Sequence, residues 1–203
     1  MDKLLTIRLL LDDALTYHDS KKAGALAIKG LKAAQNKESL GEVNYFKGQL
    51  EMLNENFKKA IEYFDRAITF NPKDGASYND RALCMIELGI IDDALEYFER
   101  GIKAEPDFAT IHHNKGWLLN KIGRHSDAIR CFKTALAFDP KRPVTYENLA
   151  DTLYNIGDIR GARGAYKKAI KILPQRYKYI RRQLSKEIKA LTYQTEKKSR
   201  EKR

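Results

Sequence analysis

Proline recurs at intervals of 34 residues along most of this chain, at Pro72, Pro106, Pro140 and Pro174. A fixed period of this length is typical of stacked repeats, in which each repeat is one supersecondary element that packs on its neighbours. Proline ends a helix because its ring clashes with the preceding turn and it has no N–H group to donate. Each proline is therefore expected to close one repeat, whereas an ordinary helical bundle has no reason to keep the spacing.

Four further columns keep the same register. The first lies 12 residues ahead of the second and holds small residues, which let two antiparallel helices approach closely. We therefore expect Gly48 to lie against Ala60, and we expect the aromatic column to fill the gap between successive helix pairs. The columns are Gly48, Ala82, Gly116 and Ala150; Ala60, Ala94, Ala128 and Ala162; Phe64, Phe98, Phe132 and Tyr166; and Ala67, Gly101, Ala135 and Ala169.

Glycine also recurs between the two helices of each repeat, at Gly89, Gly123 and Gly157. A residue in the left-handed conformation commonly ends a helix, and glycine adopts it without a steric penalty. Glu55 takes this place in the preceding repeat, so the turn there is expected to be looser.

These columns resemble the tetratricopeptide repeat family, whose signature is a small residue in the first helix, Ala-x-x-x-Phe in the second and a closing proline. The resemblance implies an all-α fold, a right-handed solenoid of helix-turn-helix repeats with a C-terminal capping helix. It predicts a degenerate helical pair over 1–40, repeats over 41–74, 75–108, 109–142 and 143–176, a capping helix over 177–194, and a basic, disordered tail over 195–203.

The net charge of +11 is concentrated at the C-terminal end, because residues 175–203 contribute +8 of it. Such a segment could bind nucleic-acid phosphates or an anionic membrane surface. A solvated capping helix with a charged end has the same composition, so both interpretations stay open.

The remaining composition points away from chemistry at a cofactor. Cys84 and Cys131 lie in amphipathic helical patterns, which favours buried thiols over a disulfide or a metal site, and no histidine has metal-ligand spacing. We find no glycine-rich phosphate loop and no nucleophile elbow. The sequence therefore predicts no cofactor, no metal and no enzymatic activity. The N-terminus lacks the features of a secretory signal, and we expect a cytoplasmic location.

The resemblance implies that the first helices of the repeats line a concave groove, where a partner protein would bind as an extended peptide or a helix. Helical periodicity places an exposed stripe on these helices. The predicted peptide-binding residues are Tyr45, Phe46, Gln49, Asn79, Leu83, His113, Asn114, Trp117, Asn148, Asp151 and Tyr154.

Two features of this stripe favour peptide binding, and each has a plainer alternative. Trp117 and His113 lie one turn apart and could form a shelf for an apolar side chain, but Trp117 could instead pack against the neighbouring helix pair. Asn79, Asn114 and Asn148 could each pair with a peptide backbone, because a carboxamide both donates and accepts, or they could simply be solvated.

Family members that grip the C-terminal carboxylates of heat-shock chaperones do so with Lys, Arg and Asn side chains. At the matching places this sequence has Asn79, Leu83, Asn114, Val144 and Asn148, of which only Asn114 fits. Carboxylate oxygens need cationic donors, so we do not expect a chaperone carboxylate clamp. The sequence does not indicate the oligomeric state.

Overall fold

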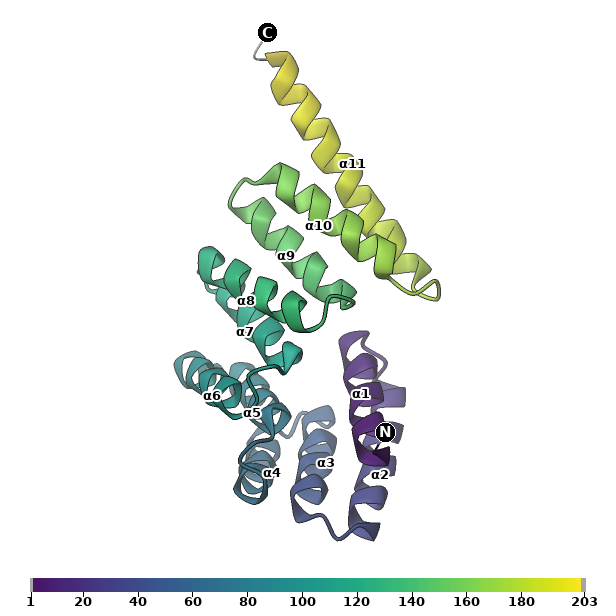
Figure 1. Ribbon diagram of the computed structural model, residues 1–203, viewed down its shortest axis with the longest axis vertical. Helices are drawn as coiled ribbons and strands as arrows, with labels where there is room; N and C mark the ends of the chain where they lie inside the picture. The colour runs from purple at the N-terminus through teal and green to yellow at the C-terminus, as the bar shows by residue number, and fades with distance from the viewer. Residues whose placement is uncertain (1, 202–203) are drawn as a thin grey trace. The chain divides into compact units, whose positions relative to one another are not determined.

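The computed structural model describes the backbone of residues 2–201 and the side chains of residues 2–193. Within this range the chain forms eleven α-helices and no β-strand, which confirms the all-α fold (Figure 1). The helices are α1 (Lys3–Thr16), α2 (Ser20–Asn36), α3 (Leu40–Leu53), α4 (Phe57–Phe70), α5 (Gly75–Glu87), α6 (Ile91–Ala104), α7 (Ala109–Lys121), α8 (His125–Phe138), α9 (Pro143–Asn155), α10 (Ile159–Ile172) and α11 (Lys178–Glu201).

The chain divides into two compact units, residues 1–111 and 112–203. Unit 1 holds α1 to α6, and each of these helices packs against the next in the chain. Unit 2 holds most of α7 together with α8 to α11, and consecutive helices from α8 onward pack in the same way. Short loops join the helices, so neighbours run antiparallel as hairpins. Within each unit the helices therefore stack as a solenoid of repeats.

The aromatic column is the core of each hairpin. Phe64 and Phe132 are fully buried. A Cβ atom added to Gly48 would lie 2.6 Å from the Phe64 ring, and one added to Gly116 would lie 2.9 Å from the Phe132 ring. The small residue of the first helix thus receives the ring of the second helix of its own hairpin. The expected column of rings therefore packs within its own hairpin, while the close approach of Gly48 to Ala60 stays a prediction.

The turns between the paired helices have the predicted conformation. Gly89, Gly123 and Gly157 have φ angles of +77°, +81° and +82°, and Glu55 has a φ angle of +60° at the equivalent place. A non-glycine residue adopts this conformation at a steric cost. The left-handed conformation predicted for the three glycines is confirmed. Glu55 adopts it as well, so the turn that we expected to be looser has the same conformation.

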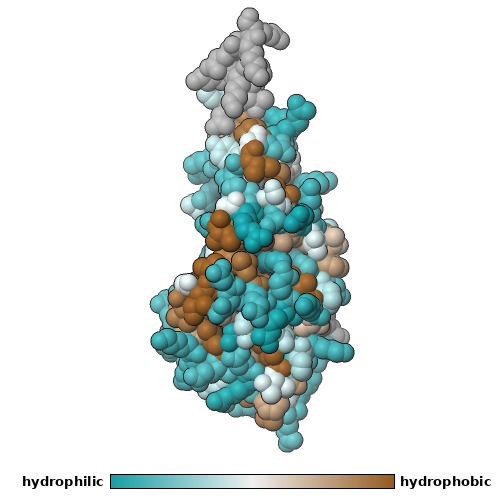
Figure 2. Space-filling view, turned by 90° about the vertical axis from the view of Figure 1, so that its left-hand side faces the viewer, coloured by the Kyte–Doolittle hydropathy of each residue, from teal (hydrophilic) through white to brown (hydrophobic). Residues whose placement is uncertain are grey.

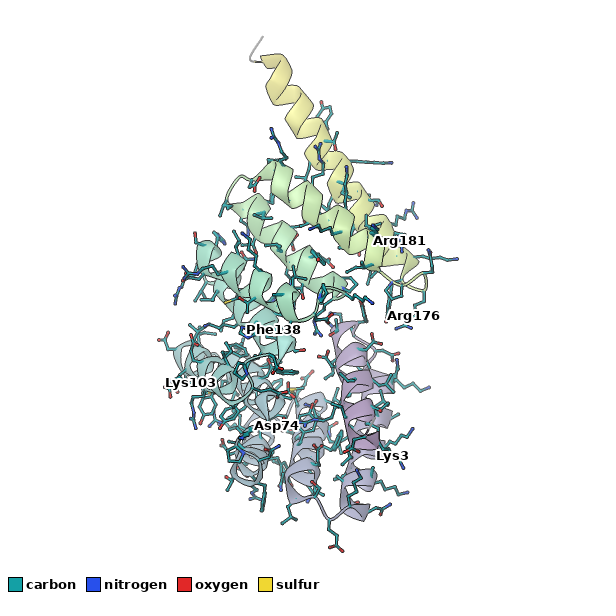
Figure 3. All side chains as sticks on the ribbon, viewed as in Figure 1. Lys3, Asp74, Lys103, Phe138, Arg176 and Arg181 are labelled. Carbon is teal, nitrogen blue, oxygen red and sulfur yellow. The ribbon has the colours of Figure 1, made fainter. Side chains whose placement is uncertain are left out.

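The last helix caps the stack through both apolar and polar contacts. Leu184 and Leu191 are buried. Arg181 donates hydrogen bonds to the carbonyl oxygens of Ile170 (2.8 Å) and Leu173 (2.6 Å) at the end of α10, and Figure 3 shows Arg181 beside that end. These carbonyls have no partner within α10, because the last turn of a helix lacks N–H groups to pair with.

Helix α11 reaches Glu201, well beyond the predicted end of the cap at 194. The backbone of 195–201, which belongs to the segment predicted as a disordered tail, continues the helix; residues 202 and 203 lie outside the described part. None of the helices in that part is both long and apolar enough to cross a membrane.

Candidate functional site

The predicted peptide-binding residues are buried to a different extent in the two units. Hydrophobic residues on the face in Figure 2 form several groups with hydrophilic residues between them, so hydropathy alone does not mark one docking surface there. Burial is more informative. Five predicted residues are buried: Tyr45, Phe46, Gln49, Asn79 and His113; five are half-buried: Leu83, Asn114, Trp117, Asn148 and Asp151; and Tyr154 is exposed.

Phe46 belongs to the core of unit 1. Its side chain has no exposed surface, and its ring occupies the space that a Cβ atom on Gly30 would need. The Tyr45 ring meets it edge-on, with centroids 5.2 Å apart. The prediction that Tyr45 and Phe46 are exposed is wrong, because helical periodicity gives the direction of a side chain but not what covers it.

Arg8 of α1 occupies the inner face of unit 1. Its guanidinium lies 3.6 Å from the Tyr45 ring centroid and donates to Glu42 at 3.1 Å. Its Nη2 atom also donates to both carboxylate oxygens of Asp74, at 2.9 and 2.7 Å. Figure 3 shows Asp74 at the start of α5. A cation of this chain thus covers Tyr45, one of the predicted peptide-binding residues.

The carboxyl group of Asp80 is a second buried polar group of unit 1, and it is influenced by the charge of Arg8. Gln49 donates to one carboxylate oxygen of Asp80, and Asn79 donates to the other at 2.8 Å. Burial raises the pKa of Asp80 to about 7, although the hydrogen bond from Asn79 opposes the shift. The Gln49 Oε1 atom is buried without a hydrogen-bond partner among the described residues. The prediction that Gln49 and Asn79 are exposed is therefore wrong.

His113 is a buried histidine of unit 2. Its Nδ1 atom lies 3.0 Å from Thr145 Oγ1, and Asn148 donates to Nε2 at 3.4 Å. The imidazole lies near the Phe132 ring, with centroids 5.7 Å apart. Burial, aided by the charge of Arg142, lowers the pKa of His113 to about 3, so the ring is neutral at physiological pH. The predicted shelf of His113 and Trp117 is wrong, since His113 joins α7 to α9 instead.

Trp117 keeps part of its surface. Its ring is half-buried, and the ammonium group of Lys121 lies 5.9 Å from the ring centroid. Asn148, on α9, bonds to His113 and is half-buried as well. We define the inner face of unit 2 by Trp117, Asn148, Asp151 and Tyr154.

A cavity of about 390 Å³ opens at one end of this inner face, between α9, α10 and α11. Tyr154 at its rim is 44% exposed. The Tyr166 hydroxyl donates to Asp151 within the cavity. The lining residues are Glu147, Asp151, Tyr154, Asn155, Tyr166, Gln183, Leu184 and Glu187.

The charge in this cavity is negative. Burial raises the pKa of Glu147, and the nearby charge of Asp151 raises it further. Burial also raises the pKa of Asp151, while Tyr166 and Lys121 oppose the shift. Like charges in a half-buried site disfavour each other's ionised form. A cation in the cavity would relieve this repulsion.

Sequence reasoning missed parts of both inner faces. Arg8 and Glu42 belong to the first helices of successive hairpins, but α3 begins 37 residues after α1 rather than 34, so the 34-residue columns do not pair the two residues. Gln183 and Glu187 were missed because the side of α11 that faces α9 depends on how the capping helix docks.

Comparison with protein families finds the tetratricopeptide repeat at residues 41–74, 86–143 and 144–176, which together make up more than half of the chain. Comparison with curated protein sequences finds no match.

Solved structures with the same fold include TTC0263, a thermophilic tetratricopeptide repeat protein of Thermus thermophilus. It is 17% identical, with a TM-score of 0.72, over 91% of this chain and 98% of that one. YrrB, described as having an unusual peptide-binding site, is 20% identical, with a TM-score of 0.56, over 81% and 84%. The first such domain of Spaghetti (RPAP3), bound to the HSP90 peptide SRMEEVD, is 12% identical, with a TM-score of 0.55, over 61% and 94%.

Proposed function

Since this chain belongs to the tetratricopeptide repeat family, we propose that it is a scaffold that binds a segment of another protein on the inner face of unit 2. The observation that carries the proposal is the open cavity beside Asp151 and Tyr154. Both residues belong to the stripe that the sequence predicts for a ligand. The family is one of repeat scaffolds, so a catalytic role is not part of the proposal, and the cytoplasm remains the compartment expected from the sequence.

Unit 2 is favoured over unit 1 because its inner face keeps accessible groups. In unit 1, Arg8 already pairs with Glu42 and Asp74 and covers Tyr45. A ligand would have to displace a largely buried ion pair there, and breaking such a pair is costly.

The cavity favours a lysine or arginine side chain of the partner. Glu147 and Asp151 supply negative charge, and Tyr154 supplies an aromatic ring at the rim, a combination that attracts an ammonium or guanidinium group. RPAP3 is bound to the peptide SRMEEVD, which is rich in acidic residues. The same carboxylates would repel such a peptide, in agreement with the expectation that no chaperone carboxylate clamp exists here.

Selection of peptides from a random library on the full chain tests this proposal. The selected peptides should share a Lys or Arg, and they should bind the variant Glu147→Gln, Tyr154→Ala at least about tenfold more weakly, because it loses a charge and a ring from the cavity. The variant Tyr179→Ala is the matched control, since it removes an exposed tyrosine from α11 outside the cavity. Equal binding by the wild type and the cavity variant would place the site elsewhere.

A further inference from the structure

The formal charge changes sign between the two units. Unit 1 carries 15 Lys or Arg and 19 Asp or Glu residues, a net charge of −4, whereas unit 2 carries 23 and 8, a net charge of +15. The excess of positive charge therefore belongs to unit 2 as a whole and extends beyond the C-terminal segment. A positive field of this size attracts polyanions over distances comparable with the Debye length, about 8–10 Å at physiological salt.

The exposed basic side chains gather on α10 and α11. In residues 159–193 the one acidic residue is Glu187, and it lines the cavity described above. The exposed basic residues in this range are Arg160, Lys167, Lys168, Lys171, Arg176, Lys178, Arg182, Lys186 and Lys189.

Helical positions place one row of this charge on the outer side of α10. Ala162, Tyr166 and Ala169 form the buried side of the helix. Lys167 and Lys171 lie on the opposite side by the 3.6-residue period. Lys168 lies on the flank toward α9, since its ammonium group is 5.7 Å from the Tyr146 ring centroid. The row of Lys167 and Lys171 is thus turned away from α9.

A second row lies on α11. Arg181 marks the flank of α11 that faces α10, because it bonds to the carbonyl groups of Ile170 and Leu173. The helix surface next to Arg181 carries three basic residues spaced one to two turns apart, Lys178, Arg182 and Lys189. Glu187 lies on the other flank, toward α9. The two basic rows therefore border the seam between α10 and α11, and the second extends over about 16 Å.

We infer that the α10–α11 seam binds the phosphate backbone of nucleic acid without sequence preference. Duplex DNA presents one phosphate charge per about 1.7 Å of its axis, so a row of about 16 Å can meet several phosphates. Tyr179 and Tyr193, 72% and 69% exposed on α11, provide aromatic rings on which unpaired bases can stack. This surface is separate from the inner face proposed for peptide binding, which uses residues on the other flank of α11.

A membrane fits the same surface less well. Peripheral membrane helices insert an apolar face below the headgroups. The aliphatic residues of α11 pack on the protein instead: Leu184 and Leu191 are buried, and Ile180 and Ile188 are half-buried. The large hydrophobic residues exposed on α10 and α11 among the described residues are the two tyrosines alone. Only the charge attraction would remain for a bilayer.

Fluorescence anisotropy with the full chain tests the inference. The probes are a labelled single-stranded RNA and a labelled DNA duplex, each of about 20 nucleotides or base pairs, and vesicles of phosphatidylserine and phosphatidylcholine serve as the membrane arm. The variant Lys167→Gln, Lys171→Gln, Arg182→Gln should bind nucleic acid at least about tenfold more weakly than the wild type, and the slope of log affinity against log salt should fall by about 2. Tighter binding of RNA than of duplex identifies the single strand as the ligand, and the reverse identifies the duplex.

The control variant Arg130→Gln, Lys133→Gln, Arg124→Gln removes the same charge from exposed positions in and just before α8 of the same unit. It should keep affinity within about threefold, as expected when only the long-range field is reduced. Equal losses in both variants would show that net charge rather than the seam is responsible, and unchanged binding in both would place the contact outside the seam. Either result overturns the inference, as does binding to vesicles without binding to either nucleic acid.

Discussion

The carboxyl group of Asp80 lies in the interior of unit 1. It accepts hydrogen bonds from Gln49 and Asn79. Its pKa of about 7 means that the folded state holds a proton which the unfolded state releases near pH 4. Between these values the folded state binds more protons, so the contribution of Asp80 to stability falls as the pH rises.

The variant Asp80→Asn should therefore raise the free energy of unfolding at pH 8 by about 1–3 kcal/mol, because it removes a buried charge. The new amide can donate to Gln49 Oε1, which has no partner in the described part of the chain. At pH 4.5 the gain should nearly disappear. Urea unfolding followed by circular dichroism at both pH values measures the difference, and a variant less stable than the wild type at pH 8 would contradict this account.

Helix α11 docks on α10 through a few specific contacts. It is the last helix of unit 2. Its buried leucines make the apolar contacts, and Arg181 makes the polar contact through its hydrogen bonds to the end of α10. A charged donor on two otherwise unpaired carbonyls is worth more than a neutral hydrogen bond. These hydrogen bonds also help to set which flank of α11 faces α9, and so they help to form the cavity.

The variant Arg181→Met keeps most of the aliphatic stem and removes the donors. It should destabilise the docking of α11 by about 1–3 kcal/mol, since two carbonyl groups lose their partners. Hydrogen exchange should become faster in α11 and in the last turn of α10. The variant Arg182→Met, at an exposed position of the same helix, is the control, and equal exchange rates in the two variants would show that the hydrogen bonds of Arg181 are not stabilising.

For the molecule as a whole, the main contrast is in charge, −4 in unit 1 and +15 in unit 2. Excess charge of one sign opposes the compact state through self-repulsion, and salt screens this repulsion. The stability of the two units should therefore respond differently to ionic strength.

Raising the salt concentration from about 0.05 M to about 0.3 M should slow hydrogen exchange in the helices of unit 2 more than in those of unit 1. Trp117 gives a second measurement, because the chain's single tryptophan lies in unit 2 and its fluorescence follows the unfolding of that unit. An equal change in both units would mean that the local ion pairs outweigh the net charge.

The sequence by itself determined the helical hairpins and their turns. Columns of Pro, Gly, Ala and Phe act within one repeat, so the left-handed turn could be predicted wherever glycine marks it. At Glu55, where glycine is missing, the sequence predicted a looser turn, and the structure has the left-handed conformation there too. It also placed Asp151 and Tyr154 on the face where the cavity opens.

Only the tertiary structure decided which residues of the inner stripe remain accessible. Periodicity fixes a side chain's direction, but burial depends on partners far away in the chain. Arg8 reaches Asp74 across 66 residues and closes the inner face of unit 1, and α11 supplies Glu187 to the cavity of unit 2. Such contacts depend on how successive hairpins and the final helix pack, which no column of the repeat encodes.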